Sequence, residues 1–177
     1  TRRATAPIPI SGHAWLISQT CAALPFQHRY ASGVIAFDRH DIDIAAWTAG
    51  DVALHGLTDA LMRDFEDTAF AGISEEHRPE VLWNAHTDKR RLELNFLFAR
   101  AVMDSQGRLK AINPKPPRSI GFALWEAFRD SWNHRHGWAD PLAPERHRHL
   151  KLPGSVISSP ARDIEGNPIF DIREELD

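Results

Sequence analysis

The sequence predicts an α+β fold with an antiparallel central β-sheet flanked by α-helices. Residues 81–87 and 92–102 carry apolar side chains at alternate positions and are joined by a short polar loop, which is typical of a β-hairpin. Residues 51–70 and 119–134 repeat their apolar positions every three or four residues, as amphipathic helices do.

The composition allows one domain with a hydrophobic core. The chain has 177 residues, of which 42% are hydrophobic, and we expect one domain over residues 1–152 and a proline- and charge-rich tail over residues 153–177. Cys21 is the only cysteine, which excludes disulfides and favours a reducing compartment. With no secretory signal and no run of about 20 apolar residues to cross a bilayer, we expect a cytoplasmic protein.

The N-terminal part is expected to contain a helix and a strand. Residues 1–10 hold two prolines and two arginines and predict an irregular segment. Ser11 is suited to cap a helix over residues 13–23. Residues 30–37 alternate as a strand does, and Gly33 within them indicates a close backbone approach.

Two longer helices follow. The helix over residues 51–70 turns its charged side chains away from an apolar stripe, and Gly72 stands where a C-terminal cap is expected. Past Trp138 the chain is rich in proline and charge, which predicts loops and a short strand near Ile169. The apolar stripes are Leu54, Leu57, Leu61, Met62 and Phe65 in the first helix, and Leu124, Trp125, Phe128 and Trp132 in the second.

The hairpin carries three chemically interesting side chains on one face. Because side chains alternate across a strand, a loop of two or four residues places His86, Glu93 and Asn95 together. A three-residue loop would separate them. The predicted register pairs His86 with Arg91, Asn84 with Glu93 and Leu82 with Asn95.

One imidazole nitrogen and two hard oxygen donors predict a divalent metal site. Mg²⁺ or Mn²⁺ suits this set better than a structural zinc, which favours thiolates and more histidines. Three protein ligands would leave positions for phosphate oxygens and water. A sheet face that is polar because it meets solvent has the same alternation, so the pattern alone leaves both interpretations open.

Charge is unevenly distributed along the chain. Residues 38–80 have eleven acids and three arginines, a net charge of −8, whereas residues 89–118 have eight basic residues and two acids, a net charge of +6. This polarity indicates one face that could meet a polyanion. Two ordinary solvated surfaces of opposite sign would explain it equally well.

Three segments of the chain carry a family resemblance. The triplet lies within Trp83-Asn-Ala-His-Thr-Asp-Lys-Arg-Arg-Leu-Glu-Leu-Asn-Phe, which His28-Arg-Tyr-Ala-Ser-Gly-Val-Ile-Ala-Phe precedes and Trp132-Asn-His-Arg-His-Gly-Trp follows. Over roughly residues 10–150 the chain resembles the His-Glu-Asn relaxases. These are the mobilisation nucleases of colicin-type plasmids, a branch of the His-hydrophobe-His endonuclease superfamily.

The resemblance implies a metal-dependent relaxase (nuclease) domain in the bacterial cytoplasm. Such an enzyme binds single-stranded DNA at a plasmid transfer origin and nicks one strand by transesterification, using a tyrosine and one metal ion, here held by His86, Glu93 and Asn95. The implied partners are the origin DNA, a relaxosome accessory protein and a coupling protein. Phosphate contacts and base stacking would come from Lys89, Arg90, Arg91, Arg108, Lys110, Lys115 and Trp138.

The nucleophile departs from the family pattern. The family carries its tyrosine on a helix near the N-terminus, before the segment that begins here, so we expect that strand and helix to be missing. Tyr30 is the only tyrosine and therefore the one candidate nucleophile, but it aligns with a different family position. We expect Tyr30 to be structural, with a buried ring and a hydrogen-bonded hydroxyl.

Three other functions stay open. A DNA-binding remnant or truncated domain would bind metal and DNA without the nucleophilic tyrosine. A metal-dependent hydrolase would use activated water in its place. A protein-interaction module would present the polar hairpin face to a partner.

Overall fold

The computed structural model describes residues 6–115 and 119–146. The described residues up to Asp140 belong to one compact unit, and a second unit begins at Pro141. The described part of the second unit contains a single 3-10 turn, η2, at Pro144–Arg146. The expected domain boundary at residue 152 and the expected strand near Ile169 lie outside the described residues.

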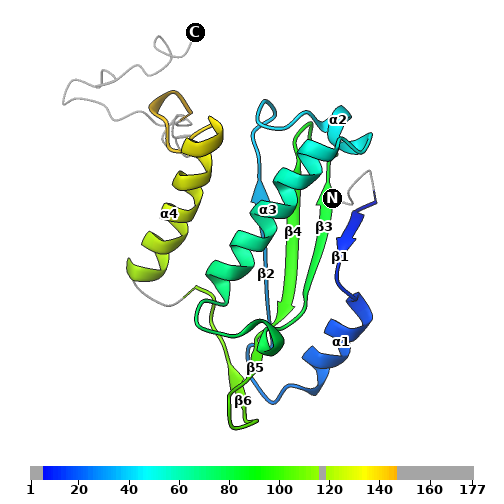
Figure 1. Cartoon of the computed structure of the whole chain (residues 1–177), viewed down its shortest axis with the longest axis vertical. Coiled ribbons are helices and arrows are strands. Elements are labelled where there is room, and N and C mark those ends of the chain that lie inside the picture. The colour runs from blue at the N-terminus through cyan, green and yellow to red at the C-terminus, as the bar shows by residue number, and fades with distance from the viewer. Residues whose placement is uncertain (1–5, 116–118, 147–177) are drawn as a thin grey trace, which may run out of the picture. The chain divides into compact units, whose positions relative to one another are not determined.

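A four-stranded antiparallel sheet forms the centre of the first unit (Figure 1), and with its helices it confirms the predicted α+β class. The strand order is β1–β3–β4–β2, so the predicted hairpin occupies the two central positions. The strands are β1 (Ile8–Ser11), β2 (Tyr30–Ala36), β3 (Val81–His86) and β4 (Glu93–Ala99).

Strand β1 occupies residues 8–10 of the segment that was expected to be irregular, of which residues 1–5 lie outside the described residues. Ile8 pairs with Ala85 and Pro9 with Asn84, before a bulge shifts the register at Ser11. The strand lies at the edge of the sheet, where a proline without an N–H need not interrupt the hydrogen-bond ladder. Its short length and its proline hide the alternation by which longer strands are identified.

The strand expected over residues 92–102 is divided at Arg100. The Arg100 side chain turns away and its Nε donates to the Ile112 carbonyl oxygen at 2.7 Å, while the chain passes into a separate two-stranded sheet. That sheet consists of β5 (Ala101–Met103) and β6 (Leu109–Ala111).

Four α-helices occur within the described residues, and those expected over residues 51–70 and 119–134 are confirmed. Among the described residues, none of the helices combines the length and apolar character needed to cross a membrane. The helices are α1 (Ala14–Ala23), α2 (Ile44–Thr48), α3 (Val52–Ala69) and α4 (Ser119–His136), with a 3-10 turn, η1, at Glu75–His77.

The start of α1 differs from the expected one, and α2 is a helix that the sequence did not predict. Ser11 does not cap α1, because it is the last residue of β1. The capping position is held by His13, whose side chain caps no amide and instead contacts Glu80, with Nδ1 2.6 Å from Oε1. The short helix α2 was not expected; the Asp43 carboxylate caps it by accepting from the amides of Ala45 and Ala46.

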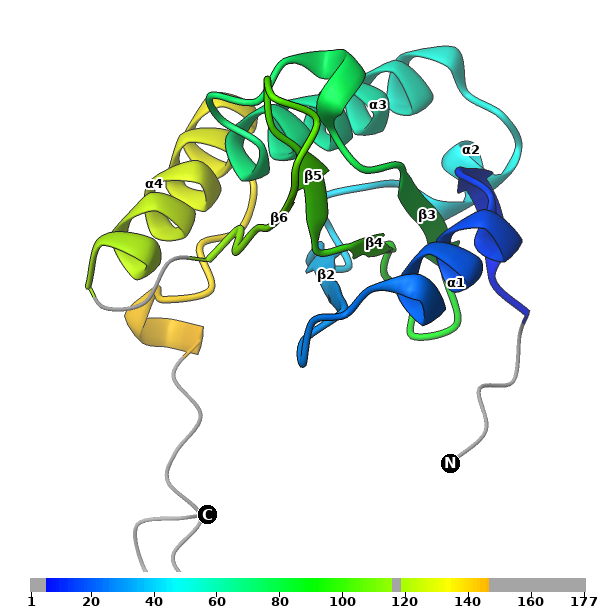
Figure 2. The same ribbon diagram turned by 90° about the horizontal axis from the view of Figure 1, so that it is seen from below.

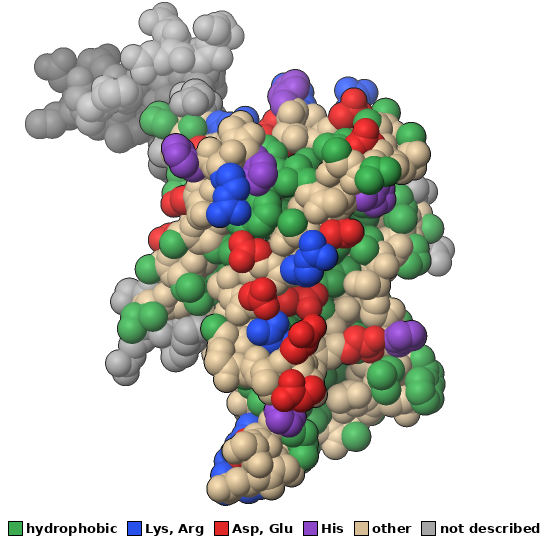
Figure 3. Space-filling model, in the orientation of Figure 1, with side chains coloured by type: hydrophobic (Ala, Val, Ile, Leu, Met, Phe, Trp, Pro, Cys, Tyr) green, Lys and Arg blue, Asp and Glu red, His purple; other side chains and the backbone are tan. Residues whose placement is uncertain are grey.

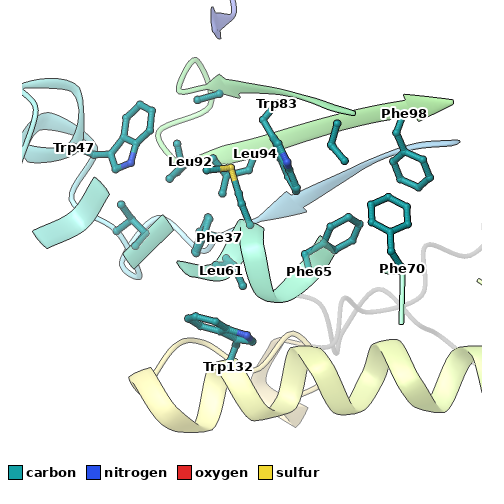
Figure 4. Packing of buried hydrophobic residues seen from close by; sticks show 14 residues of the cluster. Phe37, Trp47, Leu61, Phe65, Phe70, Trp83, Leu92, Leu94, Phe98 and Trp132 are labelled. Carbon is teal, nitrogen blue, oxygen red and sulfur yellow. The ribbon is translucent and has the colours of Figure 1, made fainter. Parts of the chain in front are cut away.

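Helix α3 covers one face of the sheet, and α1 lies on the other side (Figure 2). The core lies between α3, the sheet and α4 (Figure 4). Phe65 of α3 links all three, because its ring is 5.4 Å from Trp83 and 5.0 Å from Trp125 between centroids. The labelled buried residues are Phe37, Trp47, Leu61, Phe65, Phe70, Trp83, Leu92, Leu94, Phe98 and Trp132.

The buried stripe of α4 differs from the predicted one at Leu124. Trp132 is buried and Trp125 and Phe128 are half-buried against the core, but Leu124 is 41% exposed. At 3.6 residues per turn, Leu124 lies at the margin of the stripe that the other three define.

Two indole groups find carboxylate partners on α3. Trp83 Nε1 donates to Glu66 Oε1 at 2.7 Å, and Trp132 Nε1 donates to Asp64 Oδ2 at 2.6 Å. An indole N–H withdrawn from water needs an acceptor, which explains why acids lie next to the core. Burial raises the pKa of Glu66, against the opposing effects of the Trp83 hydrogen bond and the Arg78 charge.

The face that α3 covers is acidic. Figure 3 shows acidic side chains along the middle of this face, over α3, with a few basic ones among them. The acids come from the segment at residues 38–80, whose net charge is −8. A polyanion is therefore disfavoured on this side of the sheet.

We predict that Gly33→Ala destabilises the sheet. A Cβ at Gly33 would lie 2.5 Å from Cζ of Phe96. The Phe96 ring is held in place because it packs on Phe65, with 4.4 Å between centroids. The free energy of unfolding, measured by urea denaturation, should fall by about 1–3 kcal/mol.

Gly56→Ala in α3 is the matched control. A Cβ at Gly56 would have no neighbour within 4 Å, so alanine should stabilise the helix by about 0.5–1 kcal/mol. A Gly33→Ala variant as stable as the unsubstituted protein would contradict the close approach between β2 and Phe96.

Candidate metal centre

The observed register brings the three predicted ligands closer together than expected. His86 pairs directly with Glu93, and Asn84 pairs with Asn95, so the predicted register is wrong by two residues. The loop has six residues, 87–92, instead of two or four, and Arg90 within it adopts a positive φ of 56°. Because six is also even, the three side chains still share one face.

The packing of the core explains this register. Trp83 stands opposite Phe96 and Val81 opposite Phe98, which places the large apolar side chains of both strands over α3. The predicted register would have paired Trp83 with Leu94 and left Phe98 beyond the end of β3. Aromatic pairing across the strands is therefore favoured over a tighter turn.

The triplet lies on the sheet face opposite α3, on the side where α1 contacts β3 and β4 (Figure 2). We call it the open face because its β2 residues are exposed. Strand β2 continues this face beside β4, because Ala36 pairs with Glu93 and Val34 with Asn95. The β2 residues on the open face are all exposed; they are Tyr30, Ser32, Val34 and Ala36.

Two cationic side chains lie over Glu93. Its Oε1 accepts from Arg91 Nη2 at 2.8 Å, from Arg91 Nε at 3.1 Å and from Lys89 Nζ at 3.3 Å. The Glu93 side chain is only 4% exposed, whereas those of Lys89 and Arg91 are 54% and 41% exposed. The carboxylate is thus buried beneath the two basic side chains, an arrangement that we call the cationic clamp.

The clamp keeps Glu93 ionised. Burial alone would raise the pKa of this carboxyl, but the hydrogen bonds and charges of Arg91 and Lys89 outweigh burial and hold the pKa below its ordinary value. At neutral pH the open face therefore carries a buried carboxylate, which is the protonation state that a metal requires.

The other two side chains offer one donor atom each. His86 Nδ1 is buried and has no hydrogen-bond partner among the described residues, an arrangement that is costly unless a water or an ion completes it. Asn95 Nδ2 donates to the Glu93 carbonyl oxygen at 3.2 Å, which leaves Oδ1 as the atom that can meet a cation.

The donor set fits a hard divalent ion. An imidazole nitrogen, a carboxylate and an amide oxygen suit Mg²⁺ or Mn²⁺, and the buried His86 Nδ1 is available to such an ion because it has no hydrogen-bond partner among the described residues. Within residues 6–115 and 119–146, no three His, Cys, Asp or Glu side chains are grouped so that they could hold a metal. A metal centre here therefore depends on Asn95 as its third ligand.

Tyr30 is not buried as expected. Its side chain stands on the open face, the residue is 58% exposed, and its hydroxyl makes no hydrogen bond to a described residue. Tyr30 pairs with Ala99, four residues along β2 from the partner of Asn95, which is about 13 Å at the ordinary strand rise. The backbone of Tyr30 is therefore remote from the triplet.

The predicted DNA-contacting residues fall into two groups instead of one. Lys89, Arg90 and Arg91 lie in the loop between β3 and β4, whereas Arg108 and Lys110 lie on the β5–β6 hairpin at the opposite end of the sheet (Figure 1).

Arg108 of the second group and Lys115, which follows β6, are already engaged. Arg108 Nε is 2.9 Å from Asp104 Oδ2, and Lys115 Nζ lies 4.1 Å from the centroid of the Phe122 ring. The predicted DNA-contacting residues that lie next to the triplet are therefore those of the loop between β3 and β4.

Trp138 is not the exposed stacking platform that we expected. It is half-buried and stacks on His136 and Trp132, with 4.8 and 5.9 Å between ring centroids. The edge of Phe37 also meets it at 5.0 Å. Its position just beyond α4 suggested exposure, but the chain folds back so that the Ala139 amide donates to Asp41.

The clamp on Glu93 is not among the features expected from the sequence. The sequence does contain its signal, because Arg91 and Glu93 are two residues apart and so project to the same side of an extended chain. The family resemblance assigns Arg91 to phosphate contacts alone.

Comparison with known proteins gives two similarities. The chain is 28% identical to DNA relaxase MbeA of Escherichia coli over 157 residues, 89% of this chain and 27% of that protein. It is 28% identical to cryptic plasmid protein C of Neisseria gonorrhoeae over 125 residues, 71% of this chain and 53% of that protein. The chain thus spans about a quarter and about half of these curated relatives, which support a plasmid mobilisation relaxase-like protein. No family model and no solved structure matches it.

We predict opposite pH dependences for Glu93→Gln and Glu66→Gln. Because the pKa of Glu93 is depressed, its ionisation stabilises the fold above the ordinary value of about 4.5, and this contribution is lost as the pH falls through the depressed pKa. Glu93→Gln should therefore be less stable than the unsubstituted protein at neutral pH and approach it in acid.

Glu66 is the control of opposite sign. Its pKa is raised in the folded protein, so the unfolded chain loses its proton at a lower pH than the folded chain. The free energy of unfolding therefore falls as the pH rises from about 4.5 to the raised pKa. Over that range Glu66→Gln should gain stability relative to the unsubstituted protein. Urea unfolding at a series of pH values measures both; a pH-independent difference for Glu93→Gln would show that the clamp does not stabilise its ionised form.

Proposed function

We propose that this chain is the metal- and DNA-binding part of a relaxase that nicks single-stranded plasmid DNA by metal-dependent transesterification. The observation that carries the proposal is the juxtaposition of His86, Glu93 and Asn95 on an open sheet face, beside basic residues of the hairpin loop. The similarity to DNA relaxase MbeA supports it.

Each ligand has a defined role in this proposal. His86 would offer Nδ1, Glu93 a carboxylate oxygen and Asn95 Oδ1 to Mg²⁺ or Mn²⁺. The bound ion would polarise the scissile phosphodiester and stabilise the charge that develops on its oxygens. Because β3 and β4 are the central strands, neighbouring strands on both sides hold the ligands in position.

The open face would carry the nucleic acid. Lys89, Arg90 and Arg91 would neutralise phosphates next to the metal. Tyr30 and Val34 are exposed along β2 and could contact bases of an extended single strand. On this proposal the DNA is that of a plasmid transfer origin, in the bacterial cytoplasm, with a relaxosome accessory protein and a coupling protein as further partners.

A second function is favoured by the position of Tyr30. A nucleophile has to approach the phosphorus to about 3 Å, whereas Tyr30 lies four residues along β2 from the partner of Asn95. A domain that binds metal and DNA without cleaving the strand would have this geometry.

We predict that His86→Ala weakens the binding of Mn²⁺. Calorimetric titration of the unsubstituted chain should show one Mn²⁺ site, and loss of one of three protein ligands should weaken it by at least about tenfold. His28→Ala is the matched control, because His28 is exposed in the loop before β2. Equal Mn²⁺ affinity in His86→Ala and His28→Ala would contradict the proposed centre.

A denaturing gel separates the candidate activities. The chain is incubated with single-stranded transfer-origin DNA and Mn²⁺. A covalent protein–DNA band that Tyr30→Phe removes indicates transesterification through Tyr30. Free cleaved DNA without an adduct indicates a hydrolase. From the distance of Tyr30 to the triplet, we predict that this chain binds the DNA without forming an adduct, and an adduct would show that Tyr30 reaches the metal site.

A further inference from the structure

The cationic clamp sets the state of the proposed metal centre. Glu93 is the one negatively charged member of the triplet, and Arg91 and Lys89 together make three hydrogen bonds to its Oε1. Both cations are held within 3.3 Å of this oxygen. A metal that uses Oε1 therefore has to take the place of these hydrogen bonds.

The clamp also opposes the charge of a metal. The three side chains of the clamp, one carboxylate with one lysine and one arginine, carry a net charge of +1. A divalent cation brought to Glu93 would meet two positive charges at short range. Their repulsion is weakly screened, because the carboxylate is almost completely buried. The two cations therefore disfavour metal entry.

The same two side chains are suited to a phosphate. The guanidinium of Arg91 matches the oxygens of a phosphate in a bidentate fork, and Lys89 offers a compact positive charge. Both side chains reach solvent on the open face, with 41% and 54% of their surface exposed. Phosphate and Glu93 would therefore compete for the same donors.

We propose that DNA phosphates replace Glu93 as the partner of Lys89 and Arg91, so that DNA binding makes Glu93 available to the metal; we call this replacement the exchange. This rests on the proposed function. Without DNA, Lys89 and Arg91 donate their hydrogen bonds to Glu93 Oε1. When phosphates of a single strand take these cations, Glu93 is released to the metal together with His86 and Asn95. DNA and metal then bind cooperatively, and each raises the affinity for the other by the same factor.

The first test measures Mn²⁺ affinity by calorimetry, with and without a mixed-sequence single-stranded oligodeoxynucleotide. The oligonucleotide should tighten Mn²⁺ binding by the chain about tenfold. In the double variant Lys89→Gln/Arg91→Gln, Mn²⁺ should bind about tenfold more tightly without DNA, equivalent to about 1.4 kcal/mol, and the oligonucleotide should add little. Arg129→Gln, which removes an arginine paired with Asp130 on α4, should behave like the unsubstituted chain.

The second test needs no metal. In EDTA, Glu93→Gln should bind the labelled oligonucleotide about tenfold more tightly than the unsubstituted chain, because both cations are released to phosphate. Glu126→Gln makes the same charge change at an exposed position of α4 and should gain clearly less. An equal gain in oligonucleotide affinity in the two variants would show that the net charge of the chain explains the effect, and would overturn the exchange.

The outcomes separate this inference from the proposed function. Mn²⁺ binding that depends on His86 but is unchanged in the double variant and by DNA overturns the exchange and leaves the metal centre intact. A chain that binds no Mn²⁺ in any form overturns the metal centre, and the test in EDTA still decides whether Glu93 restrains the two cations. Circular dichroism melts of each variant show that the fold is retained.

Discussion

The alternation of β4 is the constraint on which the rest of the structure depends. Each face of this central strand has a distinct environment. Leu94, Phe96 and Phe98 face α3, and Glu93 and Asn95 lie on the open face. The aromatic side chains determine which way the strand is turned, because their burial stabilises the core by far more than any polar contact on the open face can offset. The position of the two oxygen donors is therefore a consequence of hydrophobic packing.

Periodicity was sufficient to predict the elements with a strong one-sided pattern. β2, β3, α3 and α4 lie close to their predicted ranges, and the shared face of His86, Glu93 and Asn95 followed from the parity of the loop. Parity survives an error of two residues in register, which is why the triplet was found although its pairing was wrong. The register itself depended on aromatic contacts across strands, which no short window of sequence contains.

The misplaced features depend on contacts between distant residues. β1 exists because β3 offers it an edge, and Trp138 is half-buried because the chain after α4 turns back to Asp41. The exposure of Tyr30 follows from the alternation of β2, which leaves every second residue on the open face. The clamp on Glu93 was missed because opposite charges near each other in sequence were assigned to separate roles.

The six-residue loop between β3 and β4 also restricts how sequences of this kind can diverge. Insertion or deletion of one residue would turn Glu93 and Asn95 into the core or force the aromatic residues into solvent. Two residues can be gained or lost together with much less effect, since the pleat then returns to the same face. Among divergent relatives that keep the site, the spacing from the histidine to the glutamate should therefore change in steps of two.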